Sequence, residues 1–86
     1  MNTADLLDWL RGHGFTPQDD SGPYESWFDR GPIRVVVAGT APEVDEILVH
    51  AFTDDPARLL VWSASFTPGI PIDVVAGAIG AAIRAV

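Results

Sequence analysis

Apolar residues recur every three or four positions at both ends of the chain, which is the spacing of one face of an α-helix. Near the N-terminus this stripe holds Leu6, Leu7 and Leu10, and Gly14-Phe15 predicts a glycine-terminated helix end with Phe15 packed on Leu10. Near the C-terminus the stripe consists of Ile72, Val75, Ile79, Ile83 and Val86. The pattern therefore predicts one helix at each end of the chain.

Between these helices the period of the pattern shortens to two, as in strands that bury one face. Tyr24–Asp29 is rich in aromatic residues, Arg30–Pro32 forms a compact turn signal, and Ile33–Ala38 holds three successive valines. These segments predict a β-hairpin. Alternate residues from Ile33 onward then face the helices, and Val36 faces outward.

Residues 43–52 fit two interpretations. Residues 40–43 resemble a helix capping box, and the apolar positions after them obey helical spacing. Against a helix, the apolar run is compact and the turn-forming residues 53–56 follow it. We therefore favour a second hairpin, Glu46–Phe52 against Arg58–Phe66. In its second strand, one face is expected to hold Leu60, Trp62, Ala64 and Phe66.

These elements predict a single α+β domain over residues 1–86, in the order α-β-β-β-β-α. The expected sheet is antiparallel and four-stranded, and the terminal helices pack on one of its faces, the alternative being one helix on each face. Gly77 and Gly80 lie inside the C-terminal helix, where glycine lowers helicity. Their presence predicts that this helix lies very close to the sheet.

Composition and charge exclude several classes of function. The 86 residues are 48% hydrophobic, contain no cysteine and carry a net charge of −7, with arginine as the only strongly basic residue type. Disulfide and cysteine-based zinc chemistry are thereby excluded. Nucleic-acid and anionic-membrane partners are disfavoured. The apolar run of residues 74–83 is too short to cross a bilayer, and the N-terminus lacks a secretory signal, so we expect a cytoplasmic protein.

Candidate catalytic and metal-binding residues are few. His13 lies between two glycines at a helix end, which is typical of a solvated capping residue. His50 shares a strand face with Glu46, but no nucleophile motif accompanies it. The acidic pairs at 19–20, 45–46 and 54–55 lack the alternating spacing of a calcium loop. We therefore expect no catalytic residue, metal or cofactor, and a protein that is not an enzyme.

Two segments carry candidate interaction residues. The first combines aromatic and acidic side chains that suit a basic protein partner: Tyr24, Glu25, Trp27, Phe28 and Asp29. Strand alternation places Trp27 and Phe28 on opposite sides, so one of the two is expected to face away from the core.

The second candidate is an apolar outward face of the sheet, formed by Val36, Leu59 and Val61, with Leu48 as a further candidate member. This is the face through which two copies of the chain would join in a homodimer. The sequence thus predicts a small acidic protein-interaction domain. A structural homodimer and a DNA-mimicking inhibitor are the alternatives.

One stretch resembles a known family. Trp62-Ser63-Ala64-Ser65-Phe66-Thr67-Pro68, continuing into Val74-Val75-Ala76, is similar to the module ending of the actinobacterial domain of unknown function 317. The likeness covers about a quarter of the chain. It implies an actinobacterial, phage or mobile-element source, and it implies no activity.

Overall fold

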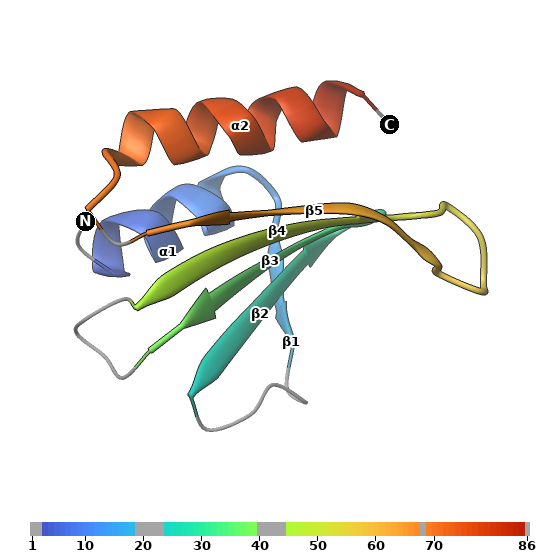
Figure 1. Cartoon of the computed structure of the whole chain (residues 1–86), viewed down its shortest axis with the longest axis horizontal. Helices are drawn as coiled ribbons and strands as arrows, with labels where there is room; N and C mark the ends of the chain where they lie inside the picture. The colour runs from blue at the N-terminus through green and yellow to red at the C-terminus, as the bar shows by residue number, and fades with distance from the viewer. Residues whose placement is uncertain (1–2, 19–23, 40–44, 68, 86) are drawn as a thin grey trace.

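The computed structural model describes residues 3–18, 24–39, 45–67 and 69–85. Its elements, in chain order, are α1 (Thr3–Gly12), β1 (Thr16–Gln18), β2 (Glu25–Arg30), β3 (Ile33–Ala38), β4 (Glu46–Phe52), β5 (Leu60–Phe66) and α2 (Ile72–Arg84). The α+β class and the antiparallel sheet are therefore as predicted (Figure 1).

The sheet has five strands, in the order β1-β2-β3-β4-β5, with every neighbouring pair antiparallel. The expected count of four was wrong because Thr16–Gln18, a short segment with a central proline, pairs with β2 as a further strand. A proline fits here because β1 is an edge strand, where one side of the backbone makes no ladder bonds.

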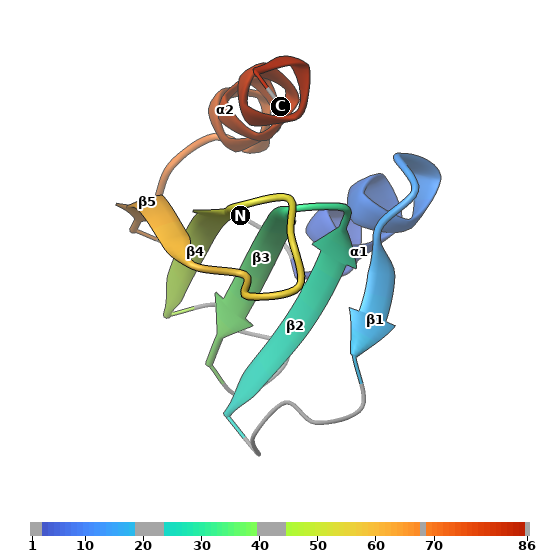
Figure 2. The same ribbon diagram turned by 90° about the vertical axis from the view of Figure 1, so that its right-hand side faces the viewer.

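Both helices lie on the same face of the sheet, as Figures 1 and 2 show. Their buried residues join those of the strands in one core: Leu6, Leu10, Phe15, Phe28, Ile33, Val35, Val37, Ile47, Val49, Ala51, Val75, Ile79 and Ala82. In β3 and β4 these residues occupy alternate positions, which is the period of a strand with one buried face. The prediction of helices on one face is confirmed.

The end of α1 has the predicted glycine motif. Gly14 has a φ of 82°, a left-handed conformation that glycine adopts without steric cost. The amide of Phe15 donates to the carbonyl of Leu10 at 3.0 Å, and that of Gly14 donates to Arg11 at 3.3 Å. These bonds form a Schellman motif, which brings Phe15 into the core beside Leu10.

Residues 46–52 form a strand, as favoured above, whereas the capping-box residues 40–43 lie outside the described residues. One expectation for β5 was wrong. A register shift between Ala51 and Phe52 pairs Ala51 with Trp62 but Phe52 with Leu60. Val61 is thus an extra residue, and Leu60 lies on the face opposite to Trp62.

The explanation given for the glycines of α2 was also wrong. A Cβ atom on Gly77 would meet nothing within 4 Å, and one on Gly80 would meet only the guanidinium of Arg84, at 3.3 Å. Neither glycine is therefore required by close packing on the sheet. Among the described residues, no helix is long and apolar enough to span a membrane.

Candidate functional site

The face of the sheet away from the helices, which we term the open face, carries the side chains that alternate with the core residues. The strand register aligns them in rows across the sheet. Trp27 lies opposite Val36, and Val36 lies opposite Leu48. In the next row Asp29, Arg34 and His50 follow one another. No described helix or strand covers these rows (Figure 2).

The open face is hollowed over a volume of about 230 Å³. The apolar lining of this aromatic hollow comes from four strands and consists of Trp27, Val36, Leu48, Phe52 and Leu60. Its polar lining consists of Glu25, Arg34 and His50. Because antiparallel sheets with one helical layer usually present polar side chains to water, a lining dominated by apolar residues is unusual.

Arg34 organises one side of the hollow. Its Nε donates to Oδ1 of Asp29 at 2.7 Å and its Nη2 donates to Oδ2 at 2.9 Å, so the ion pair is bidentate. The guanidinium carbon lies 4.6 Å from the ring centroid of Trp27 and 5.8 Å from that of Phe52. Cation–π attraction and the ion pair together hold the two aromatic rings beside one neutralised charge.

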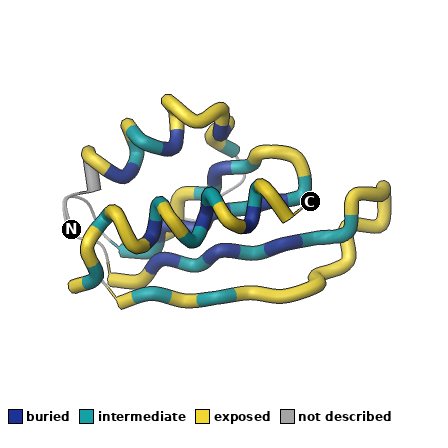
Figure 3. The backbone as a smooth tube through the Cα atoms, turned by 90° about the horizontal axis from the view of Figure 1, so that it is seen from above, coloured by how far each residue is buried: buried dark blue, intermediate teal, exposed yellow. Residues whose placement is uncertain are grey.

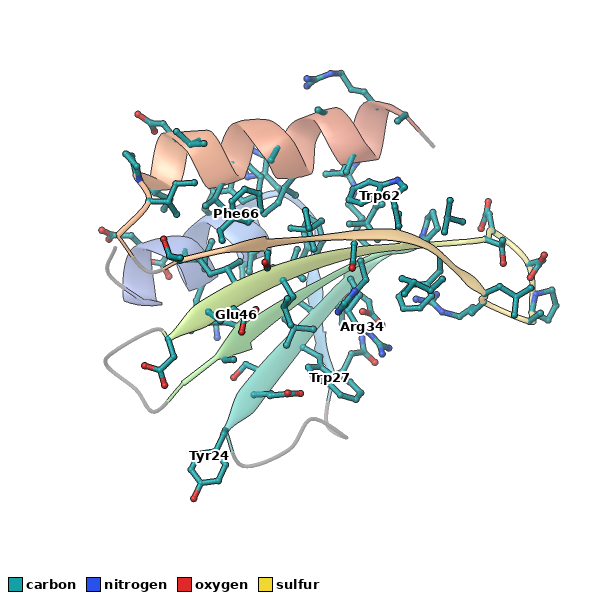
Figure 4. All side chains as sticks on the ribbon, in the orientation of Figure 1. Tyr24, Trp27, Arg34, Glu46, Trp62 and Phe66 are labelled. Carbon is teal, nitrogen blue, oxygen red and sulfur yellow. The ribbon has the colours of Figure 1, made fainter. Side chains whose placement is uncertain are left out.

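Trp27 has a second contact at the rim of the hollow. Its indole Nε1 donates to Oε2 of Glu25 at 2.8 Å. Trp27 is therefore half-buried and held by Glu25 and Arg34, and it is one of the larger apolar surfaces on the open face. Figure 4 shows Trp27 and Arg34 on the open face, with Trp62 and Phe66 on the helix side.

His50 is the only described residue with a buried side-chain nitrogen or oxygen that has no hydrogen-bond partner, and that atom is its Nδ1. Ser63 lies directly opposite His50 on β5. Serine and histidine are residue types of a nucleophile–base pair, but no hydrogen bond joins these two. The described residues also contain no cluster of three or more His, Cys, Asp or Glu side chains placed to hold a metal ion.

The structure distributes the predicted aromatic–acidic segment over three environments. Glu25 and Trp27 line the hollow, and Asp29 lies beside it in the ion pair with Arg34. Tyr24 is 69% exposed and is not part of the lining. Phe28 is 3% exposed in the core and offers no surface to a partner, because strand alternation turns it toward the helices.

The predicted dimer face is corrected in one position. Val36 does lie on the open face, but it is only 4% exposed because its neighbours cover it at the floor of the hollow. Leu59 and Val61 are exposed at the start of β5. Leu60, between them, is the residue that lines the hollow, as the bulge requires.

Three lining residues were not singled out from the sequence: Arg34, Phe52 and Leu60. Arg34 and Phe52 carried a usable signal. Arg34 lies an even number of positions from the outward Val36. Phe52 lies an even number of positions from Leu48, which pairs with Val36. Leu60 carried none, because the bulge between β4 and β5 changes the face on which it lies.

His13 lies at the end of α1, outside the hollow. Its ring stacks on that of Trp9 with centroids 3.9 Å apart, and its Nδ1 lies 2.8 Å from the Trp9 carbonyl oxygen. Nη1 of Arg30 donates to the carbonyl of His13 at 2.9 Å. These contacts close the end of a helix, which is the capping role expected from the sequence.

Comparisons with known protein families, with curated proteins and with solved structures find no match to this chain. The resemblance to domain of unknown function 317 therefore stays a prediction.

Proposed function

We propose that this chain is a non-enzymatic protein-interaction domain of the cytoplasm, and that its docking surface is the aromatic hollow of the open face. The observation that supports the proposal is the lining of the hollow. Large apolar side chains from four strands converge on a face that the helices leave uncovered. Tryptophan and arginine are also the residue types that most often dominate the energy of protein interfaces.

The net charge of the chain favours a basic partner. Glu25 lies on its rim, and Glu46 is exposed farther along the open face. The positive charge of Arg34 is neutralised by Asp29. With a net charge of −7 on the whole chain, long-range attraction steers positively charged surfaces toward it. The occupant we propose is a protein segment with an apolar anchor flanked by Lys or Arg.

Selection from a random-peptide display library tests this assignment without assuming the sequence of the partner. Peptides are selected on the wild-type chain alone, and their binding to Trp27→Ala is measured afterwards. The enriched peptides should share an apolar anchor with neighbouring Lys or Arg, and a synthetic copy should bind Trp27→Ala at least about tenfold more weakly, which corresponds to 1.4 kcal/mol.

A matched tryptophan serves as the control. Trp62→Ala removes an indole from the opposite face of the sheet and should leave peptide affinity unchanged. Glu25→Gln should weaken binding at low salt and lose its effect as salt rises. Peptides without basic residues, or equal binding to Trp27→Ala, would contradict the proposed docking surface.

A further inference from the structure

The strand β5 forms an unprotected edge of the sheet. It pairs with β4 on one side, and no described strand pairs with it on the other. Three consecutive apolar residues at its start are exposed: Leu60, Val61 (62% exposed) and Trp62 (41% exposed). Viewed over the helices, β5 is the outermost element on its side, and no described element lies beyond it (Figure 3).

The two edges of the sheet differ in how they are protected. At the opposite edge β1 has only three residues and contains Pro17, and short length and proline both prevent further strand pairing. β5 has seven residues, and the segment 59–67 contains neither a charged residue nor a proline. A long, apolar and uncharged edge is the kind that pairs with another chain.

The register identifies which backbone groups of β5 face outward. The amide of Phe52 donates to the carbonyl of Pro32 beside β3, at 2.8 Å. Because backbone groups alternate in direction along a strand, Ala51 and Val49 point theirs at β5. Their partners Trp62 and Ala64 therefore point back at β4. The N–H and C=O groups of Ser63 and Ser65 are left facing solvent.

The sequence of this edge is nearly symmetric about Ala64. Reading outward from Ala64, serine is followed by an aromatic residue in both directions: Ser63 and Trp62 on one side, Ser65 and Phe66 on the other. A strand with this symmetry complements an antiparallel copy of itself. From this we infer that the occupant of the β5 edge is a second copy of this chain, paired antiparallel about Ala64 in a two-fold symmetric dimer.

This register pairs the outward backbone groups of β5 and also brings matching side chains together on each face of the sheet. Ser63 lies opposite Ser65 of the second copy as a hydrogen-bonded pair, using the outward groups. Trp62 lies opposite Phe66 of the second copy as a non-hydrogen-bonded pair, in which side chains are closest and aromatic pairs are stabilising. Since residues 59–67 carry no charge, this pairing places no like charges directly opposite each other. The result is one continuous ten-stranded sheet, from two sheets of five strands.

Light scattering on the purified chain tests the dimer. The wild type should have a mass of twice 9.2 kDa. Ser63→Pro removes an outward N–H without touching the ladder to β4, and Ser65→Lys places a charge on the edge, so both should halve the mass. Ser26→Lys adds the same charge on β2 and should remain dimeric. A wild-type mass of one chain up to about 1 mM would overturn the proposal.

Cysteine cross-linking tests the register, since the chain has no cysteine of its own. Ala64→Cys places two thiols opposite each other at a non-hydrogen-bonded pair, at a Cα separation of about 4.5 Å that a disulfide can bridge. Oxidised glutathione, which accepts the two electrons, should convert Ala64→Cys to a covalent dimer. Ser63→Cys, whose copies lie two residues out of register, should cross-link far more slowly. Equal rates would overturn the pairing about Ala64.

The proposals of a dimer and of a docking surface can be contradicted independently of each other. Trp27→Ala should weaken peptide binding at least about tenfold and leave the mass of the dimer unchanged. Ser63→Pro, which adds no charge beside the hollow, should do the reverse. A wild-type dimer that persists in both Ser63→Pro and Ser65→Lys would show that the copies meet elsewhere. A wild-type chain that stays monomeric but is captured by an extended foreign peptide at β5 would also reject the second copy as occupant.

Discussion

Asp29 and Arg34 illustrate how single residues shape the open face. Their bidentate pair is more than three-quarters buried from solvent on both sides, with exposed fractions of 17% and 23%. Asp29→Asn removes the carboxylate that forms the bidentate pair with the guanidinium beside Trp27 and Phe52. We expect the free energy of unfolding to fall by about 1–3 kcal/mol, measured by urea denaturation. Glu25→Gln, at an exposed position, is the control and should change it by less than about 0.5 kcal/mol.

Gly14 and Gly12 make a second residue-level comparison at the end of α1. Gly14→Ala places a side chain at φ 82° and should cost about 1–2 kcal/mol from backbone strain. Gly12→Ala adds a methyl group with no atom within 4 Å of it, in a helical residue, and should stabilise the fold by up to about 1 kcal/mol. Thermal unfolding of both variants checks that their effects on stability have opposite signs. A similar loss of stability in both variants would contradict the Schellman assignment.

At the level of elements, the sequence predicted those strands whose alternation is long and regular. Ile33–Ala38 and Glu46–Phe52 were predicted with the bounds that the structure has. β1 was missed because three residues with a central proline carry no period. The face of Leu60 was missed because residues 59–62 are all apolar, so the pattern cannot show where the bulge inserts its extra residue.

The hollow was predictable only in part, for a related reason. Strand alternation alone predicted that either Trp27 or Phe28 faces away from the core, and the structure shows that it is Trp27. The pairing of Asp29 with Arg34 depends on the register between β2 and β3, which the geometry of the Gly31-Pro32 turn sets. A pattern within one strand does not contain that register.

The helix α2 carries a prediction of its own. Because a Cβ on Gly77 would meet nothing within 4 Å, Gly77→Ala should gain helix propensity without a clash and stabilise the fold by about 0.5–1 kcal/mol. Ala81→Lys, at another exposed position of α2, exchanges two strong helix formers and is the neutral control. Both are measured by urea denaturation. Destabilisation by Gly77→Ala would show that the close approach expected from the sequence exists after all.

At the level of the whole molecule, the two proposed surfaces are geometrically compatible. Residues opposite each other in an antiparallel pair point to the same side of a sheet. Pairing about Ala64 therefore places both open faces on one side of the joined sheet and both helical layers on the other. The two aromatic hollows would face the same direction, so that a single partner surface with two docking segments can engage both.

This arrangement predicts avidity that depends on the β5 edge. The peptide selected on the wild-type chain is immobilised at low and at high density, and dissociation of the protein is followed by surface plasmon resonance. At high density the wild type should dissociate more slowly by about 10²-fold or more, because its second hollow rebinds at high effective concentration. Ser63→Pro, which blocks the edge without adding a charge, should keep the same affinity for free peptide and dissociate at one rate at both densities. The same density dependence in both proteins would contradict the prediction that avidity depends on the β5 edge.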